Sequence, residues 1–86
     1  MEYTFRIDEK LQDLIDTSIT AEDKQTTYGI AVNKFIRQYY SEDRVEAILN
    51  NYLDTPADEK HMQEFRFLQE CRKQAKAKAK ELLKIE

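Results

Sequence analysis

The chain has 86 residues, of which 41% are hydrophobic and 36% are charged, and its formal net charge at pH 7 is −3. This length allows one domain at most, with a core small enough that oligomerisation commonly stabilises it. Cys71 is the only cysteine, which excludes an intramolecular disulfide and favours a reducing, cytoplasmic compartment. No secretory signal or membrane-spanning run is expected. With one Gly and one Pro, the sequence predicts a mainly α protein with short connections.

The first eight residues contain the one run in the chain that is typical of a β-strand. Apolar and polar side chains alternate here, as they do in a strand that buries one face. A single strand leaves its backbone N–H and C=O groups unpaired, and the rest of the sequence offers no second strand. We therefore expect two copies of the chain to pair these strands as an antiparallel ribbon, a shape that fits the DNA major groove. The inward side chains would be Tyr3, Phe5 and Ile7, and the outward ones Glu2, Thr4 and Arg6.

About four helices are expected after the strand. Asp8 is suited to cap the first of them. Residues 20–27 are polar and β-branched, which indicates a connection, and Thr26 or Thr27 is expected to cap the second helix. Pro56 fits the start of the last helix. The expected helices cover residues 9–18, 28–40, 44–53 and 57–83.

The last expected helix carries most of the basic residues. Residues 72–84 have a net charge of +5, whereas residues 1–43 have a net charge of −4. The apolar stripe of this helix contains only alanine between Cys71 and Leu82, which predicts that its last turns bury little surface. Whether it packs on the body, forms a coiled coil or projects is left open. Its cations fit a solvated helix face, a phosphate contact or docking onto an acidic protein; they are Arg72, Lys73, Lys76, Lys78, Lys80 and Lys84.

This order of elements resembles the ribbon-helix-helix family of dimeric DNA-binding proteins, over the N-terminal half of the chain. The resemblance rests on the alternating run 3–8, the two amphipathic helices and the Thr26–Thr27 pair at the second helix. It implies that Glu2, Thr4 and Arg6 contact base edges. Phosphate contacts would then come from Lys24, Thr26 and Thr27. The expected dimer core comprises Tyr3, Phe5, Ile7, Val32, Phe35, Ile36 and Tyr39.

On this basis we expect a homodimeric, sequence-specific DNA-binding protein that acts as a transcriptional repressor or as a plasmid or phage accessory regulator. Residues 1–43 would form the dimerisation and DNA-binding region, and residues 44–86 a helical extension for assembly or for a partner protein. Antitoxins with this fold often carry such an extension. The alternative is a small acidic helical protein-interaction or inhibitor module that does not bind DNA, which the negative first half of the chain favours.

The remaining candidate residues do not indicate an enzyme. His61 has no second His or Cys at ligand spacing, and Cys71 has no partnered base. Thr4 and Arg6 fit the solvent face of a packed strand equally well, and the Thr26–Thr27 pair is explained more simply by helix capping. We therefore expect no catalytic residues, no cofactor and no metal site.

Overall fold

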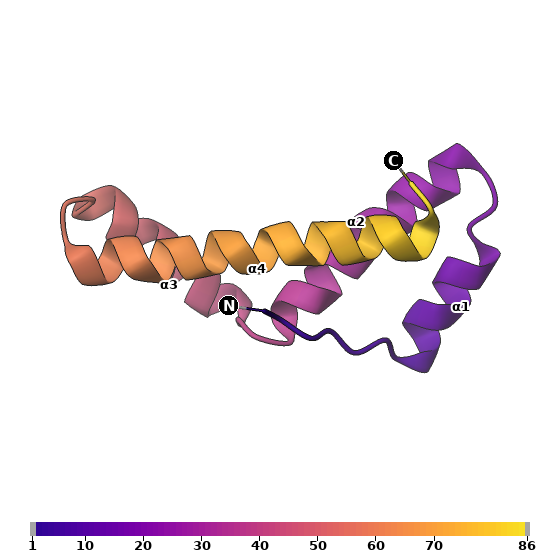
Figure 1. The fold of residues 1–86 in the computed structure, drawn as a ribbon, viewed down its shortest axis with the longest axis horizontal. Coiled ribbons are helices and arrows are strands. Elements are labelled where there is room, and N and C mark those ends of the chain that lie inside the picture. Colours follow the sequence, from indigo (N-terminus) through magenta and orange to yellow (C-terminus); the bar gives the residue numbers. More distant parts are fainter. Residues whose placement is uncertain (1, 86) are drawn as a thin grey trace.

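The structure is a computed structural model that describes residues 2–85. In Figure 1, α4 runs along the long axis of the molecule, α2 crosses it at an angle, and α3 lies beside its first half. The short helix α1 lies at the other end and packs on α2. The expectation of a mainly α protein with about four helices is confirmed for the described residues. The helices are α1 (Glu9–Thr17), α2 (Ala21–Arg37), α3 (Glu42–Asp54) and α4 (Glu59–Leu83).

A side-chain cap fixes the start of each helix. The Asp8 carboxylate accepts a hydrogen bond from the Leu11 N–H at 2.7 Å, so the predicted cap of α1 is confirmed. The expected connection over residues 20–27 is wrong, because Thr20 caps α2 by accepting from the Asp23 N–H at 3.0 Å. Acidic side chains in this first turn favour a helix start, since they complement the helix dipole. The connection therefore lies before Ala21, and residues 26 and 27 lie inside α2.

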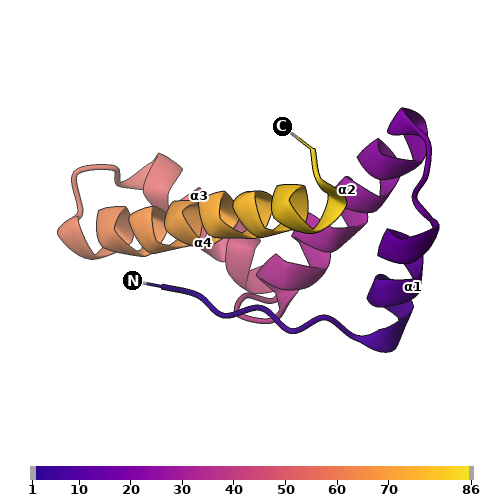
Figure 2. The same cartoon turned by 45° about the vertical axis from the view of Figure 1, so that its right-hand side comes forward.

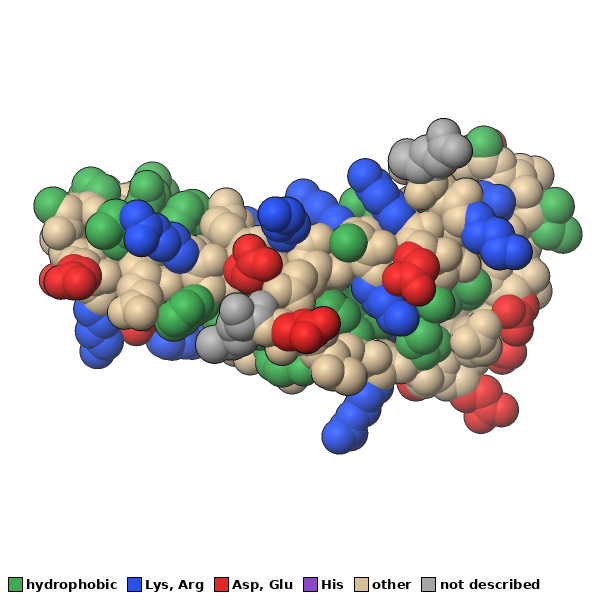
Figure 3. Space-filling model, viewed as in Figure 1, with side chains coloured by type: hydrophobic (Ala, Val, Ile, Leu, Met, Phe, Trp, Pro, Cys, Tyr) green, Lys and Arg blue, Asp and Glu red, His purple; other side chains and the backbone are tan. Residues whose placement is uncertain are grey.

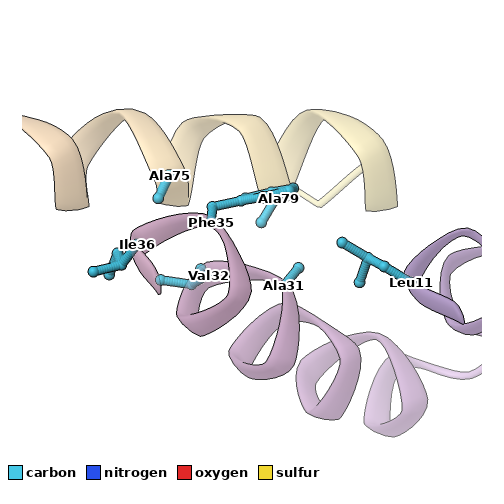
Figure 4. Packing of buried hydrophobic residues seen from close by; sticks show 7 residues of the cluster. All are labelled: Leu11, Ala31, Val32, Phe35, Ile36, Ala75 and Ala79. Atoms are coloured by element: carbon cyan, nitrogen blue, oxygen red, sulfur yellow. The ribbon is translucent and has the colours of Figure 1, made fainter. Parts of the chain in front are cut away.

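The main core forms where α2 meets the second half of α4. Figure 4 shows Phe35 of α2 pointing toward α4 between Ala75 and Ala79, with Leu11 of α1 pointing into the same cluster. Phe35, Ala75 and Ala79 are completely buried. The small side chains of the alanines let α2 and α4 approach closely. Alanine therefore contributes to the core here although its own side chain has little apolar surface. The expectation that the last turns of α4 bury little surface is therefore wrong, and α4 packs on the body.

A second cluster joins α3 to the first half of α4. Ile48 of α3 and Leu68 and Cys71 of α4 are essentially fully buried. Beside them, the rings of Tyr52 and Phe65 stack with their centroids 4.0 Å apart. This cluster continues the core along α4, so this one helix packs against both α2 and α3.

Residues 2–8, which we call the N-terminal segment, are extended but form no β-ribbon. Within residues 2–85 there is no strand, and the expected pairing of strands from two copies is wrong for the structure. Side chains alternate as predicted: Tyr3, Phe5 and Ile7 are half-buried against the helices, while their neighbours are exposed. The segment, drawn in indigo in Figures 1 and 2, runs beside α4. Its backbone finds partners on the helices of its own chain, which removes the need for a second strand.

Candidate functional site

A row of basic side chains follows one flank of α4. Successive residues turn by about 100° around a helix, so Arg72, Lys73, Lys76 and Lys80 fall within an arc of roughly 100°. We call these four residues the basic stripe. The three lysines are exposed and Arg72 is half-buried. Lys84 follows at the C-cap of the helix. Figure 3 shows Lys and Arg side chains along the upper edge of α4.

The basic stripe borders a groove between α2 and α4. Gln69 lies in this groove and accepts a hydrogen bond from the Arg72 guanidinium at 3.2 Å. No carboxylate lines the groove, and none of the four stripe cations forms an ion pair within residues 2–85. Their charge is therefore uncompensated by contact, which makes this flank attractive to anions. The lining residues are Val32, Asn33, Ile36, Gln69, Arg72, Lys73 and Lys76.

The residues expected to contact bases lie on the opposite flank of α4. The N-terminal segment borders the helix at Gln74, which is roughly 200° around the helix from Arg72. The structure therefore does not bring the outward residues of the segment together with the basic stripe. A two-stranded ribbon, on which the expectation of base contacts depends, is not formed by the described residues. The residues concerned are exposed: Glu2, Thr4 and Arg6.

The residues expected to contact phosphate lie close together in the first half of α2, but they differ in how far they are exposed. Thr27 is 4% exposed, and its hydroxyl shares a hydrogen bond of 2.6 Å with Ser18. Thr26 is exposed and donates to the Glu22 carbonyl at 3.2 Å. Lys24 lies half-buried near the start of the helix. Thr27 thus joins α1 to α2, and its hydroxyl is not accessible to a phosphate in this arrangement.

The expected dimer-core residues pack within one chain. Phe35, Val32 and Ile36 are buried with the alanines of α4, and Phe5 stacks on Phe35 with ring centroids 5.0 Å apart. The second half of α4 therefore covers the face that was expected to meet another copy. At its edge, Tyr39 remains 46% exposed. Tyr3 and Ile7 complete the set on the N-terminal segment, half-buried against the helices.

Three polar side chains hold the backbone of the N-terminal segment. The Gln38 amide pairs with Arg6 as a peptide group would, accepting from its N–H at 2.8 Å and donating to its carbonyl at 2.7 Å. The Tyr39 hydroxyl accepts from the Thr4 N–H at 3.0 Å and donates to the Thr4 carbonyl at 2.5 Å. From α4, Gln74 accepts from the Tyr3 N–H at 2.7 Å. Sequence reasoning missed these roles, because the side chains of Gln and Tyr carry no signal for a tertiary partner.

Burial and hydrogen bonds shift the pKa of a few groups. Burial, together with a hydrogen bond of 3.4 Å to Tyr40, raises the pKa of Tyr3 far above its ordinary value. The hydroxyl therefore stays protonated and donates to the Phe67 carbonyl at 3.1 Å. Burial also raises the pKa of the Cys71 thiol, and thiols in this state are poor nucleophiles.

Comparisons with known proteins add no relative to this description. No family model, curated protein or solved structure matches the chain. Within the described residues, no three His, Cys, Asp or Glu side chains are grouped to hold a metal ion. None of the helices in that part of the chain combines the length and apolar character needed to cross a bilayer. The charged surface of the molecule is therefore its most informative functional feature.

Proposed function

We propose that this chain binds DNA by contacting its phosphates with the basic stripe of α4. The observation that carries the proposal is the groove between α2 and α4, where Arg72, Lys73 and Lys76 converge and no carboxylate is present. Phosphate contacts supply most of the non-specific affinity of DNA-binding proteins. A flank with several uncompensated cations favours such contacts more than the outward row of the N-terminal segment does, because that row contains one cation and one carboxylate.

The spacing of the stripe suits a DNA strand. At a rise of about 1.5 Å per residue, Arg72 and Lys80 stand roughly 12 Å apart along α4. One DNA strand advances by about 3.4 Å per phosphate along the duplex axis, so the stripe can follow three or four phosphates. Asn33 and Gln69 lie in the same groove and have amide groups that donate hydrogen bonds to phosphate oxygens. These contacts need no second copy of the chain, because both helices belong to one molecule.

The test is the salt dependence of binding to a fluorescently labelled DNA duplex, followed by anisotropy. The test variant replaces Arg72, Lys73 and Lys76 with Gln, a residue that keeps the helix propensity of α4. The control variant replaces Lys10, Lys60 and Lys78 with Gln and has the same net charge. These control lysines lie on α1 or on the flank of α4 away from the basic stripe.

The wild-type chain should bind with a slope of log affinity against log salt of about −3 to −4, as expected for four neutralised phosphates. The test variant should lose between two and three units of that slope, and the control variant should behave as the wild type. Equal slopes for the two variants would contradict the proposal. Absence of binding by the wild-type chain would also contradict it and would favour the protein-interaction module as the function of this chain.

A further inference from the structure

The N-terminal segment has one satisfied backbone edge and one open edge. In an extended chain, the N–H and C=O groups of alternate residues point to the same side. Thr4 and Arg6 direct both groups at Tyr39 and Gln38 at the end of α2. The groups of the intervening residues therefore point the other way. On that side, the Tyr3 N–H donates to the side-chain oxygen of Gln74, and within residues 2–85 no other backbone group of residues 3–7 has a partner there.

Phe5 and Ile7 have no backbone hydrogen bond within residues 2–85. Their side chains nevertheless pack on the core, so the backbone that carries the open edge is held in place. An edge of this kind is a template for another extended chain, because its unpaired groups recur with the period of a strand. The residue spacing of the edge determines that its partner has an extended backbone.

Beside this edge lies a trough between the N-terminal segment and α4. It is lined on the segment side by residues 2–5 and on the helix side by Gln74, Ala77, Lys78 and Glu81. Ala77 is exposed and small, so it leaves room where a neighbouring strand would pass. Figure 3 shows acidic and basic side chains close together where the segment passes α4. The charged residues that line the trough are Glu2, Lys78 and Glu81, so its net charge is negative. This charge favours a basic occupant.

We propose that this trough binds an extended, basic peptide segment of another protein, which pairs as an added β-strand with the backbone of Phe5, at the border of the trough, and of Ile7, just beyond it. Main-chain hydrogen bonds supply the affinity in this mode of recognition, and side chains at alternate positions supply the selectivity. Such a segment would place its backbone about 4.8 Å from the N-terminal segment. The site lies on the flank of α4 opposite the basic stripe and is independent of DNA binding.

The test uses a seven-residue peptide of alternating Val and Lys with blocked termini, added to the full chain and followed by amide NMR. At saturation, the amides of Phe5 and Ile7 should exchange at least about tenfold more slowly, since each gains a hydrogen bond. Two matched control peptides have N-methyl groups on alternate amides, one on the odd-numbered and one on the even-numbered residues. One of these two patterns should abolish binding, because it removes the donors that face the edge.

Ala77→Trp fills the trough and should weaken peptide binding at least fivefold to tenfold, given the loss of roughly one hydrogen bond or more. Ala47→Trp, at an exposed position of α3, is the matched control and should bind as the wild type. The proposal is overturned if the peptide leaves Phe5 and Ile7 unprotected, if both methylated peptides bind equally well, or if Ala77→Trp has no effect. Protection that rises with protein concentration in the absence of peptide would also overturn it, because a second copy would then occupy the edge.

Discussion

The N-terminal segment and the helical body meet the same requirement, the pairing of backbone polar groups, in different ways. Helices satisfy their N–H and C=O groups internally, so α2 and α4 need only bury an apolar face. The extended segment has no such internal pairing and depends on side chains from other elements, chiefly Gln38 and Tyr39. The comparison teaches that an extended run does not require a partner strand when polar side chains can imitate one. Because side chains reach the segment mainly from α2, the backbone groups of Phe5 and Ile7 have no hydrogen-bond partner within residues 2–85.

The largest effect should come from Phe35→Ala, which damages both regions. Phe35 is fully buried, closes the contact between α2 and α4, and stacks on Phe5 of the N-terminal segment. Removing its ring should lower the free energy of unfolding by about 3–5 kcal/mol, because a cavity replaces it. Urea denaturation followed by circular dichroism measures this change. Phe67→Ala, at a site that is 38% exposed, is the control and should cost less than half as much; equal losses would contradict the described core.

A smaller effect should come from Tyr39→Phe, which should loosen the N-terminal segment and leave the helical body unchanged. This change keeps the ring contacts with Tyr3 and Phe5 and removes the hydroxyl that pairs with Thr4. The two lost hydrogen bonds are worth about 1 kcal/mol each, so the Thr4 amide should exchange roughly thirtyfold faster while the helices keep their protection. Tyr52→Phe is the control, because no hydrogen bond in the described part of the chain uses the Tyr52 hydroxyl. Unchanged exchange at Thr4 would show that Tyr39 does not hold the segment.

The smallest effect should be a pH dependence at Asp8, where the two regions join. The hydrogen bond from the Leu11 N–H, together with Lys34 at 3.7 Å, holds the pKa of the Asp8 carboxyl below its ordinary value of 3.8. A lowered pKa in the folded state stabilises the fold above pH 3.8, and this contribution is lost as the pH falls through the folded-state pKa.

Asp8→Asn should therefore make the free energy of unfolding fall less steeply below about pH 4, because asparagine still caps a helix but does not titrate. Asp13→Asn, which removes an exposed carboxylate from the same helix, is the matched control and should follow the wild type. Urea denaturation across this pH range measures both variants. A wild-type slope for Asp8→Asn would contradict the role given to this cap.

Local patterns in the sequence were sufficient for the approximate number of helices and for the faces of the N-terminal segment. The alternation at Tyr3, Phe5 and Ile7 correctly predicted which side chains face inward, and Asp8 correctly predicted a cap, because both depend on neighbours in sequence. The start of α2 was misplaced because several Thr residues can cap a helix. Thr20 is the cap, whereas Thr27 bonds to Ser18. The sequence signal for this start was the pair of acidic residues in the first turn after Thr20, Glu22 and Asp23, which complement the helix dipole.

The partner of the N-terminal segment and the packing of α4 could not be predicted, because both depend on distant residues. Gln38 and Gln74 are 36 residues apart and bond to the same segment. Ala75 and Ala79 are completely buried because of what packs on them, and their own size gives no sign of this. For the candidate site, composition identified the basic residues of α4. It did not indicate that Lys78 lies on the flank opposite the basic stripe, although the helical period contains that information.

Hydrogen exchange at the amides of residues 3–7 is the sharpest test of how side chains hold the N-terminal segment. The account predicts an uneven pattern: the amides of Tyr3, Thr4 and Arg6 exchange slowly, since each donates to a side chain, and those of Phe5 and Ile7 exchange at nearly the rate of an unstructured peptide. Slow exchange at Phe5 and Ile7 in the protein alone would contradict the account. It would mean that a second strand, and not the side chains of the same chain, completes the pairing of this segment.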